Sequence, residues 1–149
     1  MSITGINLDM PFDSQSIEGA SELKLDFTKL DRLPENCGVI PVAVQNAATN
    51  EVILIAYTNE TAFRETIRLK KAVFWSTSRN KLWFKGKESG NTFTIESIYV
   101  NCDQNSLVYR VIPDKGGICH TSAGGAPNNC FYRKLDMDAM KLTMADNDS

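Results

Sequence analysis

Residues 39–57 read VIPVAVQNAATNEVILIAY, and this stretch decides the fold class. It contains two short apolar runs, Val39–Val44 and Val52–Tyr57, in which β-branched residues dominate. The segment Asn46–Asn50 between them is typical of the turn of a β-hairpin. Because both runs are almost continuously apolar, we expect strands that are covered on both faces.

The sequence after this hairpin predicts one main helix and further strands. Asn59 is suited to cap a helix, and apolar residues recur at helical spacing from Ala62 to Leu69. We expect four more strands, at residues 72–76, 81–85, 92–102 and 106–112. The apolar positions change phase near Ser97, which indicates a β-bulge. The predicted fold class is therefore mainly β (α+β) with one main helix, and a second subunit is expected to cover part of the sheet.

The ends of the chain differ from its centre. Residues 1–37 are predicted to be an N-terminal extension, because they show no sustained period, and we assign them no function. Residues 38–135 are predicted to form a single domain. Residues 136–149 are predicted to be a C-terminal tail, which starts with a possible short helix at Asp136–Met140.

Composition excludes several classes of protein. Of the 149 residues, 42% are hydrophobic and 23% are charged, as in an ordinary globular domain. The net charge of −2 offers no basic field for a nucleic-acid backbone. No apolar run approaches a membrane span, and the start of the chain has acids where a secretory signal has basic residues. We therefore expect a cytoplasmic protein.

In a reducing compartment, clustered cysteines indicate metal binding or catalysis more often than disulfides. Cys102, Cys119 and Cys130 are candidate zinc ligands, and His120, the one histidine of the sequence, follows Cys119 directly. Three thiolates would leave one position of a catalytic zinc open for a water, whose pKa the metal lowers. A closed structural site with His120 as fourth ligand is an equal alternative. Cys37 has no neighbour of this kind and is expected to be structural.

Two further clusters are chemically suggestive. Around the strand 81–85, basic residues lie among glycines and hydroxyl residues, which are the types that hold phosphate; the candidates are Arg79, Lys85, Ser89 and Gly90. Trp83 could stack on a purine or pack in the core. Asn101, Asp103 and Asn105 could bind magnesium, although an ordinary turn explains them equally well.

Taken together and in order, several segments resemble phosphoribosyl-AMP cyclohydrolases over residues 38–135. They are Ile40-Pro41, Ala56-Tyr57-Thr58-Asn59-Glu60, Trp75-Ser76-Thr77-Ser78-Arg79, Leu82-Trp83-Phe84-Lys85-Gly86, Ser89-Gly90-Asn91, Asn101-Cys102-Asp103, Cys119-His120-Thr121 and Cys130-Phe131-Tyr132-Arg133.

The resemblance implies an intertwined, strand-rich homodimer with active sites at the interface. It implies a catalytic zinc held by Cys102, Cys119 and Cys130 from both subunits, with His120 left for proton transfer. The implied reaction is hydrolysis of the N1–C6 bond in the purine ring of phosphoribosyl-AMP, in histidine biosynthesis. Arg79, Trp83, Lys85, Ser89 and Gly90 are the implied substrate-binding residues.

The sequence also departs from the family pattern. The Asp-Cys-Asp-x-Asp magnesium motif of the family is Asn101-Cys102-Asp103-Gln104-Asn105 here, and an arginine of the family is Thr77. The loss of two carboxylates is expected to weaken a magnesium site. A related zinc amidohydrolase acting on another nucleotide, or a non-catalytic zinc-binding paralogue, therefore remains an alternative.

Overall fold

The computed structural model describes residues 21–25, 27–31, 33–35, 37–115 and 129–144. In these residues it is rich in strands and has one helix, which confirms the predicted α+β class. The elements are β1 (Ile40–Asn46), β2 (Val52–Thr58), α2 (Glu60–Leu69), β3 (Val73–Ser76), β4 (Lys81–Phe84), β5 (Phe93–Val100), β6 (Leu107–Pro113), β7 (Arg133–Asp136) and β8 (Lys141–Met144).

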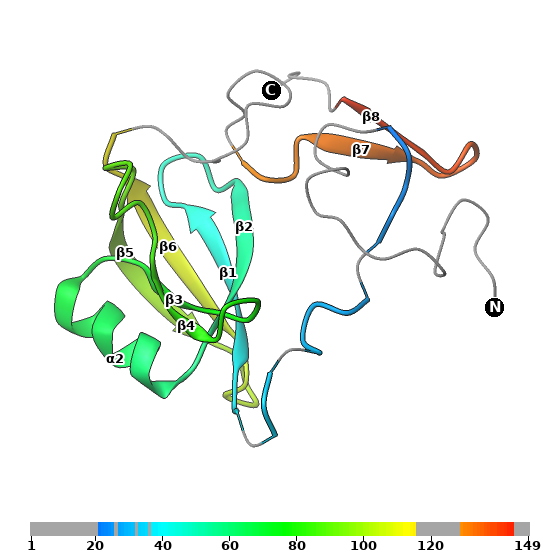
Figure 1. Ribbon diagram of the computed structural model, residues 1–149. Coiled ribbons are helices and arrows are strands. Elements are labelled where there is room, and N and C mark those ends of the chain that lie inside the picture. Colours follow the sequence, from blue (N-terminus) through cyan, green and yellow to red (C-terminus); the bar gives the residue numbers. More distant parts are fainter. Residues whose placement is uncertain (1–20, 26, 32, 36, 116–128, 145–149) are drawn as a thin grey trace.

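A four-stranded sheet in the order β2-β1-β6-β5 forms the centre of the fold (Figure 1). β1 and β2 are the predicted antiparallel hairpin, β6 runs parallel to β1, and β5 closes the other edge antiparallel to β6. The register of β5 against β6 shifts between Ile95 and Ser97, so the predicted bulge is confirmed. β2 and β5 therefore lie on opposite edges of the sheet.

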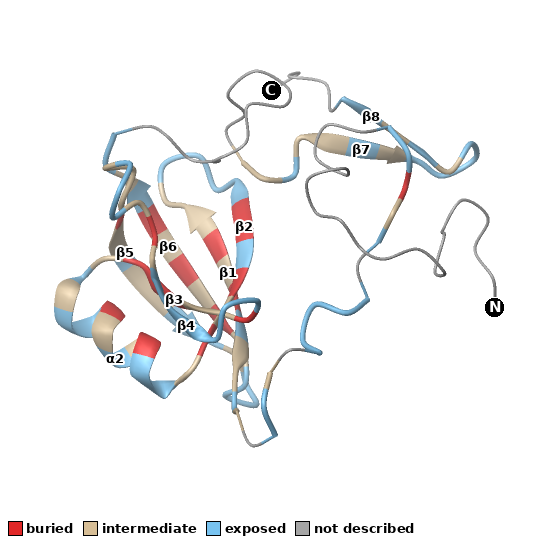
Figure 2. Ribbon diagram, in the orientation of Figure 1, coloured by how far each residue is buried: buried red, intermediate tan, exposed pale blue. Residues whose placement is uncertain are grey.

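One face of this sheet is buried beneath the β3–β4 hairpin and α2 (Figures 1 and 2). Alternate residues of the strands point into the core, and Val42, Val44 and Tyr109 are fully buried there. Phe74 of β3 packs between Tyr109 and Trp83, with ring centroids 6.0 and 5.5 Å away.

Local hydrogen bonds set the ends of α2. Asn59 caps its N-terminus by accepting a hydrogen bond from the Ala62 N–H, as the sequence predicts. Lys70 ends the helix in the left-handed conformation with φ 57°, and its N–H donates to the Thr66 carbonyl.

The second face of the sheet is not covered by the residues that the structure describes. Ala43 pairs with Ile55 and Val108, and Val108 pairs with Tyr99, so these four residues form one row across all four strands. Ile55 is 49% exposed and Tyr99 60%. The expectation that the strands are covered on both faces therefore holds for one face within a single chain.

The predicted helix at Asp136–Met140 is wrong. Asp136 ends β7 and residues 137–140 form the turn to β8, in a hairpin that extends away from the main sheet (Figure 1). The Asp136 side chain accepts hydrogen bonds from the Asp138 and Ala139 N–H groups, and Met140 has φ 56°. These short-range bonds offer the backbone an alternative to a helix. Glu22 bridges to Lys141, so part of the N-terminal segment lies beside β8.

Among the described residues, no helix combines the length and the apolar composition that a membrane span requires.

Candidate active site

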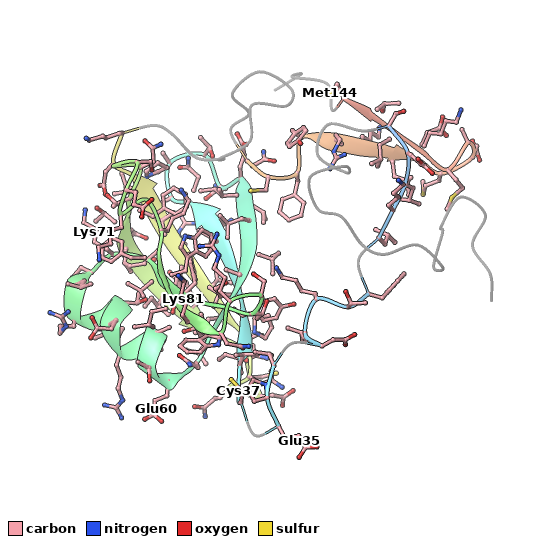
Figure 3. The ribbon with its side chains drawn as sticks, in the orientation of Figure 1. Glu35, Cys37, Glu60, Lys71, Lys81 and Met144 are labelled. Carbon is pink, nitrogen blue, oxygen red and sulfur yellow. The ribbon has the colours of Figure 1, made fainter. Side chains whose placement is uncertain are left out.

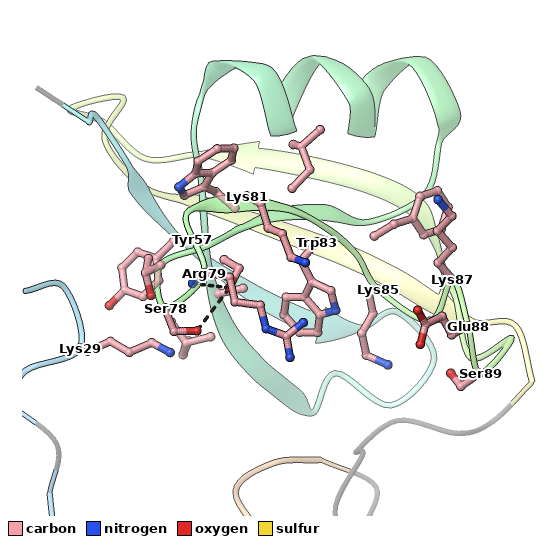
Figure 4. Close-up of a pocket in the computed structure, with 18 residues that line it drawn as sticks. Lys29, Tyr57, Ser78, Arg79, Lys81, Trp83, Lys85, Lys87, Glu88 and Ser89 are labelled. Carbon is pink, nitrogen blue, oxygen red and sulfur yellow. Dashed lines mark hydrogen bonds between the residues drawn. The ribbon is translucent and has the colours of Figure 1, made fainter. Parts of the chain in front are cut away.

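A pocket of about 720 Å³ lies along the β3–β4 hairpin (Figure 4). Its walls come from both strands, from the turn between them and from the loop that follows β4. Four of the predicted substrate-binding residues line it, namely Arg79, Trp83, Lys85 and Ser89. Gly90, the fifth, lies just beyond in the same loop, with φ 80°. The fold thus brings this predicted cluster together.

The basic residues of the pocket gather at two ends. Arg79 and Lys81 lie at the turn end, whereas Lys85 and Lys87 lie in the loop after β4. Among the described residues, neither Arg79 nor Lys81 has a carboxylate partner within ion-pair distance. Glu88 is the acidic residue among those that line the pocket. The pocket is therefore suited to an anionic ligand.

Lys85 is held more firmly than the sequence suggests. It is only 9% exposed, its ammonium group lies 4.7 Å from the centroid of the Phe93 ring, and it donates to the Asn91 carbonyl at 3.3 Å. The adjoining loop needs Gly86, because φ is 81° and a Cβ there would lie 2.2 Å from the carbonyl carbon of Asn91.

Short polar contacts order the turn end. The Arg79 N–H donates to the Ser76 hydroxyl at 3.3 Å, and that hydroxyl lies 3.3 Å from the hydroxyl of Ser78 (Figure 4). The pocket wall also contains two buried donors, Trp75 Nε1 and Thr77 Oγ1. Within the described part of the chain, neither of them has a hydrogen-bond partner. Both atoms are closed off from the solvent, so they do not reach the space of the pocket.

The structure adds pocket residues that the sequence did not indicate. Tyr57 comes from the end of β2, and Lys29 comes from the N-terminal segment. No local pattern connects these residues with the β3–β4 hairpin, because tertiary packing alone brings them to it.

Cys102 and Cys130, the two predicted zinc ligands that the structure describes, lie apart within one chain. Cys102 is exposed and follows β5, whereas the N–H of half-buried Cys130 donates to the Ile53 carbonyl of β2. β2 and β5 are three strand spacings apart, about 14 Å. A zinc ion binds each sulfur at about 2.3 Å, so one chain cannot bring both thiols to one ion. In the described residues there is no group of three His, Cys, Asp or Glu side chains that could hold a metal.

The other residues of the predicted metal site lie outside the described residues, and Cys37 is predicted to be structural. Cys119 and His120 fall within 116–128, which the structure does not describe. Cys37 is half-buried in the segment that leads into β1 (Figure 3).

The predicted magnesium residues form a hydrogen-bonded turn. Asn101 Oδ1 accepts from the N–H groups of Asn105 and Ser106 at 2.9 and 3.0 Å, and Asn101 Nδ2 donates to Asn105 Oδ1 at 2.7 Å. These bonds use both lone pairs of Asn101 Oδ1 and one of the two on Asn105 Oδ1, and Asp103 is the one carboxylate of residues 101–105. Residues 101–105 thus form a hydrogen-bonded turn with a single charged side chain, and magnesium binding here stays a prediction.

An ion pair fixes the chain just before residues 116–128. Asp114 accepts hydrogen bonds from Lys71, Thr92 and Thr94 at 2.5–2.7 Å (Lys71 is labelled in Figure 3). These donors, Lys71 first, lower the pKa of the Asp114 carboxyl from 3.8 to about 2. No local pattern indicates this contact, since Lys71, Thr92 and Asp114 are far apart along the chain.

A family model for phosphoribosyl-AMP cyclohydrolase matches residues 54–132. The chain belongs to the phosphoribosyl-AMP cyclohydrolase family. The match contains the whole β3–β4 hairpin, Cys102, Cys119 and Cys130, and it leaves out Lys29. The resemblance drawn from the sequence, and with it the prediction of an enzyme, are confirmed.

Individual relatives agree with this family. The phosphoribosyl-AMP cyclohydrolase of Cenarchaeum symbiosum is 45% identical over 112 residues, which are 75% of this chain and 94% of the relative. That of Chlorobium phaeovibrioides is 39% identical over 121 residues, 81% of this chain and 82% of the relative. The histidine biosynthesis bifunctional protein HisIE of Thermus thermophilus is 43% identical over 98 residues, which cover 66% of this chain and 44% of that protein.

Proposed function

We propose that the protein hydrolyses the N1–C6 bond of phosphoribosyl-AMP and so opens the purine ring, as a step of histidine biosynthesis. The observation that carries this proposal is the pocket with two cationic ends. Lys81 and Lys85 are four residues apart along an extended strand, about 13 Å. The substrate carries one phosphate on each of two ribose groups, attached to opposite sides of the purine. Each cationic end therefore suits one phosphate.

The residue between the two ends suits the purine. Lys81, Trp83 and Lys85 alternate along the strand and its continuation, so they belong to one face (Figure 4). Trp83 is 39% exposed in the pocket while it also contacts Phe74. An aromatic side chain that is fixed on one side and open on the other can stack on a base.

We further propose that the protein is a homodimer. The row Ile55, Ala43, Val108 and Tyr99 on the open face of the sheet forms an apolar surface with a shallow hollow of about 290 Å³. Val100 beside it is 53% exposed. Covering such a surface with a second copy would remove apolar area from water, the main driving force of association.

The same dimer would bring the predicted zinc ligands of two subunits together. Cys102 from one subunit can meet Cys119 and Cys130 from the other, although a single chain keeps Cys102 and Cys130 on opposite edges. Three thiolates and an open position are the donor set of a catalytic zinc. When bound, zinc would lower the pKa of a water so that hydroxide is available near neutral pH.

The residues of the chain would supply binding and proton transfer. Arg79 and Lys85 hold the two phosphates and Trp83 holds the purine, so that C6 is placed for attack. Ring N1 must gain a proton when the bond breaks, and His120 is the one histidine that could carry it. No step requires magnesium. A cytoplasmic location is part of the proposal, since this chemistry needs reduced thiols.

Growth of a strain that lacks its cyclohydrolase tests the proposal. Expression of the wild-type protein should restore growth without histidine, and expression of Arg79→Gln should restore it less. Arg64→Gln is the matched control, because Arg64 lies on α2, is 76% exposed and pairs with Glu60 at the surface. If folded wild-type protein accumulates and the strain still requires histidine, the proposed function is wrong.

A further inference from the structure

Lys29 lines the active-site pocket although it belongs to residues 1–37, for which no sequence pattern indicates a function. It lies in the short turn from Thr28 to Asp31, which is closed by a hydrogen bond from the Asp31 N–H to the Thr28 carbonyl at 3.0 Å. Its side chain lines the pocket beside the β3–β4 turn and extends toward Ser78 and Arg79 (Figure 4). About fifty residues separate Lys29 from that turn along the chain.

The charges around Lys29 are not compensated within the described part of the chain. Lys29, Arg79 and Lys81 line the same pocket, and none of the three forms an ion pair with a described residue. Like charges that converge on one site repel one another, so the arrangement becomes favourable when an anion binds between them.

Hydrogen-bonding capacity at this end points in the same direction. The Arg79 guanidinium and the ammonium groups of Lys29 and Lys81 supply N–H donors here, and the Ser78 hydroxyl belongs to the same turn. Glu88, the pocket's acid, belongs to the loop after β4 and hence to the opposite end. The turn end thus offers many donors and needs a ligand with several acceptor oxygens, as a phosphate monoester has.

We propose that Lys29 is a substrate-binding residue whose ammonium group pairs with the phosphate held by Arg79 at the turn end. The inference rests on the proposed function, and it makes the N-terminal segment part of the active site. Substrate would then link this segment to the β3–β4 turn through one shared phosphate.

Steady-state kinetics of Lys29→Gln test the proposal. Because Lys29 would contact a phosphate remote from the reacting bond, KM for phosphoribosyl-AMP should rise about 10-fold while kcat changes little. Added salt should raise KM less in this variant than in the wild type, since one screened charge pair is missing. Lys29→Arg should restore KM. Lys24→Gln is the matched control, because Lys24 belongs to the same segment and pairs with Glu22 at 3.6 Å outside the pocket.

A binding measurement separates this inference from the proposed function. Inorganic phosphate should raise the Tm of the wild type and of Lys24→Gln by mass action, and should raise that of Lys29→Gln less. A wild-type protein without turnover would refute the proposed function, yet the phosphate titration would still decide the role of Lys29. Equal phosphate-induced shifts in the wild type and Lys29→Gln, or an unchanged KM in an active Lys29→Gln, would overturn the inference.

Discussion

Mixing two inactive variants tests whether the zinc site is shared between subunits. Cys102→Ser removes a ligand beyond β5, and Cys130→Ser removes a ligand beside β2. The two strands are on opposite edges of the sheet, about 14 Å apart, so these ligands must belong to different subunits if they bind one ion. Each variant alone should then lose both sites of its dimer, with its zinc and its activity.

The expected recovery follows from symmetry. In a two-fold dimer of one subunit of each variant, one site receives intact Cys102 and Cys130 from different chains, and the other site lacks both. Equal mixing with free exchange makes about half of the dimers mixed, and each has one working site of two. Turnover should therefore return to about one quarter of the wild-type value per total protein.

The assay is turnover after the variants are unfolded together and refolded with zinc, with native mass spectrometry to count the mixed dimers. The control mixes Cys37→Ser with either variant, because Cys37 is not a proposed zinc ligand. It tests whether incorrect disulfides form during refolding. Mixed dimers that form in the expected amount without recovered activity would refute the shared site. Full zinc content in either variant alone would refute it as well.

Three further perturbations follow from the same geometry. Asp114→Asn should lower stability by about 1 kcal/mol at neutral pH, because the carboxylate accepts three hydrogen bonds. The pKa of Asp114 is lower in the folded state than in the unfolded state. The extra free energy of unfolding of the wild type is therefore complete above pH 4 and shrinks as the pH falls toward 2. Urea unfolding across this pH range measures this difference. Gly86→Ala should lower the free energy of unfolding by about 2 kcal/mol and raise KM, because the added Cβ would overlap Asn91 and φ is 81°. An unchanged Tm would contradict this. Asn101→Asp with Asn105→Asp should create a dependence on magnesium that wild-type turnover lacks, because it replaces two hydrogen-bonded amides with carboxylates; identical magnesium titrations of the two proteins would show that the turn is not a metal site.

Local patterns predicted the elements whose determinants are local. The hairpin of β1 and β2, the start of α2 at Asn59 and the bulge near Ser97 depend on periodicity and capping within a few residues. The turn at Asp136–Met140 was mistaken for a helix, because the side-chain bonds that Asp136 makes are not visible in a hydrophobic pattern.

The candidate site was predictable only in part, for a physical reason. Arg79, Trp83, Lys85 and Ser89 come from one hairpin and the loop after it, so nearness in sequence was a fair guide to nearness in space. Lys29 reaches the same pocket through tertiary packing, which composition does not reveal. The placement of Cys102 and Cys130 on opposite edges follows from strand order, and strand order depends on the parallel pairing of β1 with β6.

Turnover of phosphoribosyl-AMP by the purified protein, supplied with zinc, tests the central claim most directly. The reaction can be followed by mass spectrometry and by the change in purine absorbance. We predict a product heavier than the substrate by one water, with the ring opened between N1 and C6 and both phosphates retained. Folded, zinc-loaded protein that leaves phosphoribosyl-AMP unchanged, or releases a phosphate or a free base from it, would contradict the account.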